Sequence, residues 1–290
     1  MILKRIYSRI NKALSVLLGT EQIAASKNKA SFKTETKEDR SFTTEEINFI
    51  NETSIEFIFT EFGEERINAG GSKLSQNDRL EPSLQGILKF FPNAKITVYT
   101  DFDWNPIENV DFKKVNSPVN DPDHPRFGYR TGNYFKFKAL SESTADFCCA
   151  LDTDMYFLNT NIISLLYLTQ KFGFCVAFNT RQLLRQDMKM SLDVQEIKDN
   201  SLGFGQSYNQ SPMTLWKQNE RGVNYYKKAM EIMQKDPSRG SLVMWKAAWE
   251  TGLYPYVLPK QFCVCEGDVG CGDEVILHIG HPKVAEYYNV

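Results

Sequence analysis

The chain has 290 residues, 42 % of them hydrophobic and 24 % charged, which is ordinary for a globular protein. This length suits one large α/β domain, or a domain of about 240 residues with a short appendage. The formal net charge of −2 provides no broad basic field, and this excludes proteins that bind nucleic acid through a strongly basic surface.

Residues 1–19 carry the pattern of an amphipathic, basic helix. On a helical wheel of residues 2–18, the apolar side chains except Val16 fall on one half and the basic ones on the other. Such a helix lies among lipid headgroups, where anionic lipids attract its basic side chains, so the pattern predicts peripheral membrane contact. The alternative is a helix that packs on the rest of the chain or on a partner subunit. The polar residues 20–50 predict a linker.

The sequence shows no secretory signal pattern and no stretch long enough to cross a bilayer, so we expect a cytoplasmic protein. Cys148 and Cys149 lie inside an apolar run and resemble small core residues. Cys263, Cys265 and Cys271 lie close together, but their spacing does not match the common zinc motifs. Free thiols in a reducing compartment are the expectation, with a zinc site as the alternative.

Residues 51–290 alternate between strand and helix patterns and predict a single catalytic domain. The apolar runs predict strands at residues 55–59, 94–100, 147–151 and 174–178, and the amphipathic runs predict helices at residues 84–91, 135–142 and 162–168. This alternation predicts an α/β fold with a Rossmann-like, doubly wound, mostly parallel sheet covered on both faces. Ligands of such sheets bind outside the carboxyl ends of the strands, where Asp101, Asp152 and Asp154 fall.

Asp152 and Asp154 interrupt the apolar run FCCALDTDMYFLN directly after a predicted strand. A carboxylate beside a core needs a cation, hydrogen-bond donors or water. Magnesium and manganese ions prefer oxygen ligands and usually keep positions open for substrate phosphates. An isolated Asp-x-Asp is most often a solvated turn, but its position after a buried strand predicts a divalent-metal site here.

The C-terminal segment VILHIGHPK contains two histidines that could supply a nitrogen ligand to the predicted metal site. His278 follows a short apolar stretch, and His281 and Lys283 follow closely. A neutral imidazole can complete a metal shell, and a lysine can act as a point charge on a phosphate. A lone histidine is more often structural, but the strand end and the nearby lysine favour His278 as a third metal ligand.

A strand with Asp-x-Asp, followed far along the chain by His-x-Gly-x-x-Lys, resembles the retaining glycosyltransferases related to glycogenin and to bacterial lipopolysaccharide galactosyl- and glucosyltransferases. These enzymes have the GT-A fold. In that group the two aspartates and the histidine bind manganese, and the lysine contacts the donor phosphates. The resemblance implies these roles for Asp152, Asp154, His278 and Lys283, with manganese or magnesium as the ion.

Three further residues are candidate donor contacts. The segment RTGNYFKFKAL is similar to the basic helix that precedes the Asp-x-Asp strand in many such enzymes, which implies that Arg130 and Lys136 contact the donor. Asp101 follows the second predicted strand and is a candidate contact for ribose or base. The alternative for Asp101 is a helix cap or a turn.

The resemblance implies an enzyme that transfers a hexose from a nucleotide diphosphate sugar, with UDP as the expected nucleotide, to a saccharide or lipid-linked glycan. Retention of anomeric configuration is the expected outcome. One alternative is a sugar-1-phosphate nucleotidyltransferase, which needs a glycine-rich basic loop after its first strand, where this chain has TEFGEER. The other is a non-catalytic protein of the same fold that binds nucleotide sugars.

Overall fold

The computed structural model describes residues 40–62, 76–101, 103–116, 127–179, 208–235, 240–270 and 272–290. The helix expected over residues 1–19, and most of the expected linker, lie outside the described residues. Residues from Asp39 to Val290 form one compact unit. Among the helices that the structure describes, none is both long enough and apolar enough to cross a membrane.

The described chain alternates between strands and helices. Its first half contains α2 (Thr44–Glu52), β1 (Ile55–Glu61), α4 (Gln76–Phe90), β2 (Lys95–Thr100), β3 (Val110–Lys114), α5 (Phe127–Glu142), β4 (Phe147–Leu151) and β5 (Met155–Phe157). Its second half contains α6 (Ile163–Phe172), β6 (Phe174–Phe178), β7 (Tyr208–Trp216), α8 (Glu220–Lys235), α9 (Gly240–Thr251), β8 (Tyr256–Leu258), β9 (Ile276–His278) and α10 (Pro282–Tyr288). The expected α/β fold is therefore confirmed.

Seven of these strands form one sheet in the order β3-β2-β1-β4-β7-β6-β8, and β5 pairs with β9 in a second, two-stranded sheet. The pairs β1–β2, β1–β4, β2–β3 and β6–β8 are parallel. Strand β7 runs antiparallel to both of its neighbours, β4 and β6. The sheet is thus mostly parallel, as expected, but the reversed β7 makes it a mixed sheet.

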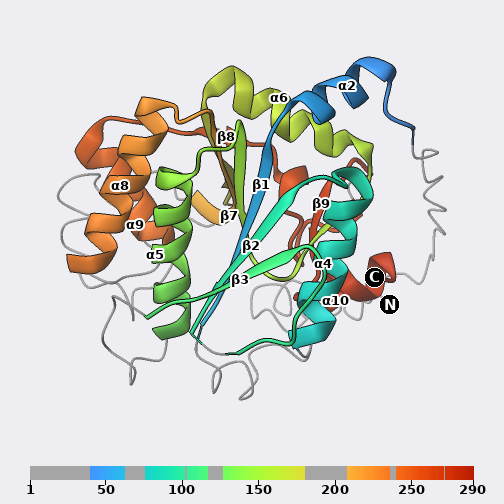
Figure 1. Ribbon diagram of the computed structural model, residues 1–290, viewed down its shortest axis with the longest axis horizontal. Helices are drawn as coiled ribbons and strands as arrows, with labels where there is room; N and C mark the ends of the chain where they lie inside the picture. The colour runs from blue at the N-terminus through green and yellow to red at the C-terminus, as the bar shows by residue number, and fades with distance from the viewer. Residues whose placement is uncertain are drawn as a thin grey trace, which may run out of the picture. The chain divides into compact units, whose positions relative to one another are not determined.

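Helices cover both faces of the large sheet, as Figure 1 shows: α5, α8 and α9 lie on one side and α4 and α6 on the other. The side chains of β4 alternate between these two layers, as strand geometry requires. Phe147, Cys149 and Leu151 join the core under α4 and α6, whereas Cys148 and Ala150 join the core under α5, α8 and α9. Since both faces are buried, the sequence of β4 is apolar throughout.

Helix α2 begins inside the segment expected as a linker. Thr43 caps this helix in a reciprocal capping box with Glu46. Phe49 then stacks on Tyr167 of α6, with ring centroids 4.9 Å apart, and lies 6.1 Å from the ring of Trp216 at the end of β7. The compact unit therefore starts before residue 51, and its first described helix packs on the sheet through aromatic contacts.

The aromatic centre of the core predicts a large loss of stability on truncation. Phe57 of β1 is fully buried, and its ring lies 5.6 Å from Phe91, 6.1 Å from Phe147 and 5.5 Å from Phe157. Phe57→Ala is expected to lower the free energy of unfolding by about 3–5 kcal/mol, because it removes buried surface and leaves a cavity. Urea denaturation measures this, with Phe57→Leu as the milder control. Equal stability of wild type and Phe57→Ala would contradict the packing.

Candidate metal centre

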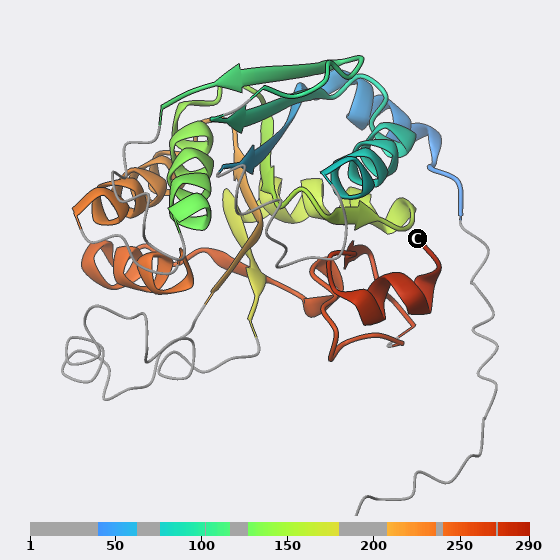
Figure 2. The same ribbon diagram turned by 90° about the horizontal axis from the view of Figure 1, so that it is seen from below.

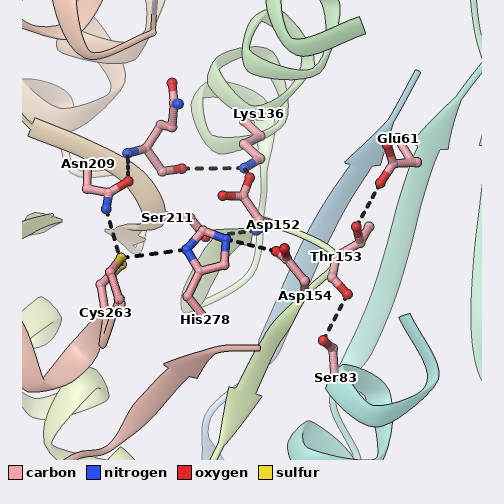
Figure 3. Close-up of polar contacts among 12 residues, drawn as sticks. Glu61, Ser83, Lys136, Asp152, Thr153, Asp154, Asn209, Ser211, Cys263 and His278 are labelled. Carbon is pink, nitrogen blue, oxygen red and sulfur yellow. Dashed lines mark hydrogen bonds and ion pairs between the residues drawn. The ribbon is translucent and has the colours of Figure 1, made fainter. Parts of the chain in front are cut away.

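The candidate site lies where parallel strands end at one edge of the sheet. Strands β1, β2 and β4 run in the same direction, so Glu61, Asp101 and Asp152 fall at the same edge. Because β7 is reversed, it begins at this edge, and Ser211 lies beside Asp152. Figure 3 shows the side chains that converge from these elements.

The turn between β4 and β5 is held from three directions. The backbone N–H of Asp152 donates to Ser211 Oγ at 2.7 Å. The hydroxyl of Thr153 donates to the buried carboxylate of Glu61 at 2.7 Å, and Ser83 Oγ of α4 donates to the Thr153 carbonyl at 2.9 Å. These bonds fix the backbone that carries the Asp-x-Asp pair, which is the support a binding site needs.

Asp154 and His278 are brought together by the pairing of β5 with β9. Met155, the first residue of β5, lies opposite His278, and the N–H of Ile279 donates to the Asp154 carbonyl at 2.8 Å. The two side chains meet with His278 Nε2 and Asp154 Oδ1 3.1 Å apart. Figure 2 shows the C-terminal segment, coloured red, on the opposite side of the sheet region from α8 and α9, which are coloured orange. The short antiparallel pairing of β5 with β9 thus brings together Asp154 and His278, which lie more than a hundred residues apart in the sequence.

Gly280 gives the Asp154 carboxylate its space. A Cβ at Gly280 would lie 1.8 Å from Asp154 Oδ2, a distance that two non-bonded atoms cannot adopt. The glycine of the His-x-Gly motif therefore has a steric reason, since a larger residue would displace the carboxylate.

Asp152, Asp154 and His278 fit a divalent cation. One ligand atom from each lies within 4.8 Å of the others. Two carboxylates and an imidazole are donors that magnesium and manganese accept. The 3.1 Å between Asp154 and His278 is close to the roughly 2.9 Å that separates neighbouring donors in an octahedral shell of magnesium. The prediction that these three residues form one group is confirmed, and the identity of the ion stays a prediction.

The charge on His278 is governed by Asp154. Burial by itself disfavours the imidazolium, but the attraction and hydrogen bond of Asp154 raise the pKa of His278 well above its usual value. A metal ion needs an imidazole lone pair, so metal binding at His278 competes with its protonation.

Lys136 lies against the same centre. It is only 1 % exposed in the middle of α5, and its ammonium forms an ion pair with Asp152 Oδ1. The carbonyl of Gln210 accepts a second, longer bond from Lys136 at 3.4 Å. Lys136 was expected to contact the donor. In the structure its ammonium contacts Asp152, where it balances the negative charge of the carboxylate and orients it.

The other predicted donor contacts lie further from the carboxylates. Asp101 sits at the same sheet edge but two strands from Asp152, roughly 10 Å away at the usual strand spacing. Lys283, in the first turn of α10, forms an exposed ion pair with Glu266 at 2.8 Å. The side chain of Arg130 lies outside the described residues. Their roles toward a donor stay predictions.

A second group of donors adjoins the first. The sequence left a zinc site at these cysteines as the alternative to free thiols, but it did not place His278 with them. Cys263 and Cys265 have their sulfur atoms 3.9 Å apart, and Cys265 Sγ lies 3.8 Å from His278 Nδ1. The three residues form a second possible metal-binding set in the described part of the chain. Hydrogen bonding from Cys263, together with the interaction with His278, holds the pKa of Cys265 well below its usual value. Cys271 lies outside the described residues.

No family model matches the chain, and no curated protein matches it. The fold and the site nevertheless define a class. This is an α/β protein with a mixed seven-stranded sheet and a candidate metal centre of two aspartates and a histidine at one edge of that sheet.

Proposed function

We propose that the protein is a metal-dependent glycosyltransferase that takes a hexose from a nucleotide diphosphate sugar, with UDP as the nucleotide. The observation that carries the proposal is the convergence of Asp152, Asp154 and His278 at the carboxyl edge of a mostly parallel sheet. This is the edge at which α/β proteins bind nucleotides.

The proposed division of labour follows from the contacts. When bound, a manganese or magnesium ion would neutralise negative charge on a leaving nucleoside diphosphate. Asp152, Asp154 and His278 would hold that ion, while Lys136 keeps Asp152 oriented through their ion pair. Lys283 is proposed to reach the phosphates by leaving its exposed pair with Glu266, which is weak because water screens it.

The remaining parts of the proposal concern the two substrates. Asp101 lies two strands from the metal ligands, a separation that suits the ribose or base of a nucleotide whose diphosphate lies near the ion. The acceptor is proposed to be a saccharide or a lipid-linked glycan. A membrane-bound acceptor agrees with the amphipathic pattern of residues 2–18. Retention of configuration rests on the family resemblance alone.

Two other functions remain to be separated from this one. A sugar-1-phosphate nucleotidyltransferase would bind a nucleoside triphosphate and release pyrophosphate. A non-catalytic protein would bind the nucleotide sugar but neither transfer nor hydrolyse the sugar. Incubation of the protein with a nucleotide sugar and manganese, with and without pyrophosphate, distinguishes all three. Only a transferase releases free nucleoside diphosphate, by transfer or by slow hydrolysis. Only a nucleotidyltransferase converts the nucleotide sugar and pyrophosphate to nucleoside triphosphate and sugar 1-phosphate, and a binding protein does neither.

A thermal-shift screen of nucleotide sugars identifies the donor. We expect UDP-sugars to raise the melting temperature only with manganese or magnesium present, because a ligand at about 100 times its Kd adds about 2.7 kcal/mol to the folded state. Asp154→Asn should lose the shift, whereas Asp111→Asn, which changes an exposed carboxylate on β3, should keep it. A shift of the same size in EDTA would contradict a metal-dependent donor site.

A further inference from the structure

The sulfur atoms of Cys263 and Cys265 lie at the spacing of a tetrahedral metal site. Bond lengths of about 2.3 Å to sulfur and about 2.0 Å to nitrogen place two thiolates about 3.8 Å apart, and a thiolate and an imidazole about 3.5 Å apart. The corresponding distances here are 3.9 Å between the two sulfurs and 3.8 Å from Cys265 Sγ to His278 Nδ1. Little movement is needed to place the three donors around one ion.

The surroundings are those of a metal-binding group. Asn209 Nδ2 donates to Cys263 Sγ at 3.2 Å, a bond that stabilises negative charge on the sulfur. The segment that carries Cys263 and Cys265 is held beside β9, because Val264 N–H donates to the Ile276 carbonyl at 2.9 Å and His278 N–H donates to the Val264 carbonyl at 3.0 Å. The backbone that positions the cysteines therefore also positions the histidine.

His278 faces the two donor sets with different ring nitrogens. Its Nδ1 points toward Cys265, and its Nε2 lies 3.1 Å from Asp154 Oδ1. Figure 3 shows the imidazole of His278 between Cys263 and the carboxylate of Asp154. A neutral imidazole has one lone pair, so it ligates through one nitrogen and carries a proton on the other.

We propose that Cys263, Cys265 and Nδ1 of His278 form a second metal site, for a thiophilic ion of the zinc class, that excludes binding of His278 to an ion held by Asp152 and Asp154. With zinc on Nδ1, the proton sits on Nε2 and is donated to Asp154, an arrangement in which a carboxylate orients a metal-bound histidine. With manganese on Nε2, the proton sits on Nδ1, which then has no lone pair for an ion held by Cys263 and Cys265. Zinc and manganese then compete for one side chain.

The sulfur site does not depend on the proposed glycosyltransferase activity, so its test uses metal ions alone. Cobalt replaces zinc in thiolate sites and gives an intense sulfur-to-cobalt charge-transfer absorption. The full chain, reduced and titrated with cobalt, should develop this absorption and lose it when zinc is added. Cys265→Ser should abolish the band and weaken zinc binding at least about 100-fold, because a ligand matters more than the outer-shell partners whose loss costs 10- to 100-fold.

Three variants make the test specific. Asp152→Asn should leave cobalt absorption and zinc affinity little changed, because Asp152 belongs to the group with Asp154 and His278 and not to the group with the two cysteines. Asp154→Asn should keep the band but bind zinc more weakly, since its carboxylate orients His278. Cys175→Ala, which removes a buried thiol of β6 outside both sets, is the control for general loss of a cysteine. Circular dichroism must show that each variant is folded.

Competition is read from the electron paramagnetic resonance signal of free manganese. Zinc should release bound manganese from the wild-type chain, and Cys265→Ser should bind manganese normally but no longer release it at the same zinc concentration. Absence of the charge-transfer band in the reduced wild-type chain, or the same band in Cys265→Ser, would overturn the sulfur site. Zinc and manganese bound together without loss of affinity would overturn the exclusion. Neither outcome bears on whether sugar is transferred.

Discussion

Asp154→Asn is expected to reduce sugar transfer by about 100-fold or more while the protein stays folded. The amide keeps the shape of the side chain but removes the charge that attracts a divalent ion, and it leaves His278 with an uncharged partner in place of the carboxylate at 3.1 Å. Loss of an ion that neutralises the leaving diphosphate costs several kcal/mol of barrier, which corresponds to this factor. The rate of nucleoside diphosphate release at saturating donor measures the effect.

Asp111→Asn is the control for that experiment, because Asp111 is an exposed carboxylate on the edge strand β3. It should retain the wild-type rate. The same loss is expected when wild-type protein is assayed in EDTA and should be reversed by added manganese. Full activity of Asp154→Asn, or full activity in EDTA, would rule out the metal mechanism.

Gly280→Ala is expected to weaken manganese binding nearly as much as the loss of Asp154. One added methyl group would lie 1.8 Å from Asp154 Oδ2 and 2.8 Å from its Cγ, so the carboxylate has to move away. The effect is steric, because Gly280 is not among the glycines with positive φ and alanine is compatible with its backbone. Manganese affinity, measured by titration calorimetry, should fall by at least tenfold, about 1.4 kcal/mol.

Gly267→Ala provides a matched control in the same C-terminal segment, since nothing lies within 4 Å of the position that its Cβ would occupy. Its manganese affinity should equal that of the wild type. If Gly280→Ala binds manganese as tightly as Gly267→Ala does, then the position of the Asp154 carboxylate does not depend on the absence of a side chain at residue 280, and this part of the site's explanation is wrong.

The sequence predicted best those elements whose patterns are local. Strands β4 and β6 are continuous apolar runs, and their predicted bounds, residues 147–151 and 174–178, agree with the structure. The Asp-x-Asp and His-x-Gly motifs could be matched before the fold was known, because each occupies a few consecutive residues. Helix α2 also had a local signal in the capping box of Thr43 and Glu46, but the polar composition around it favoured a linker.

Features that depend on distant contacts could not be predicted in the same way. The reversed direction of β7 has no signature within residues 208–216, since it is set by pairing with β4 and β6. The sequence around Lys136 indicates a basic residue on a helix. Its contact with Asp152 depends on the packing of α5 against β4, which the sequence does not show. The spacing of Cys263 and Cys265 matches no common zinc motif, because their partner, His278, lies further along the chain and is brought beside them only by the backbone bonds between Val264 and β9.

The most direct test of the account is a crystal structure of the protein with manganese and UDP, with data collected at an energy where manganese scatters anomalously. We predict a single strong anomalous peak bonded to Asp152, Asp154 and His278 at about 2.0–2.2 Å, the usual range for oxygen and nitrogen ligands of such ions, with diphosphate oxygens completing the shell. A diphosphate bound elsewhere in the protein, or bound at this edge with no manganese between it and the two aspartates, would contradict the account.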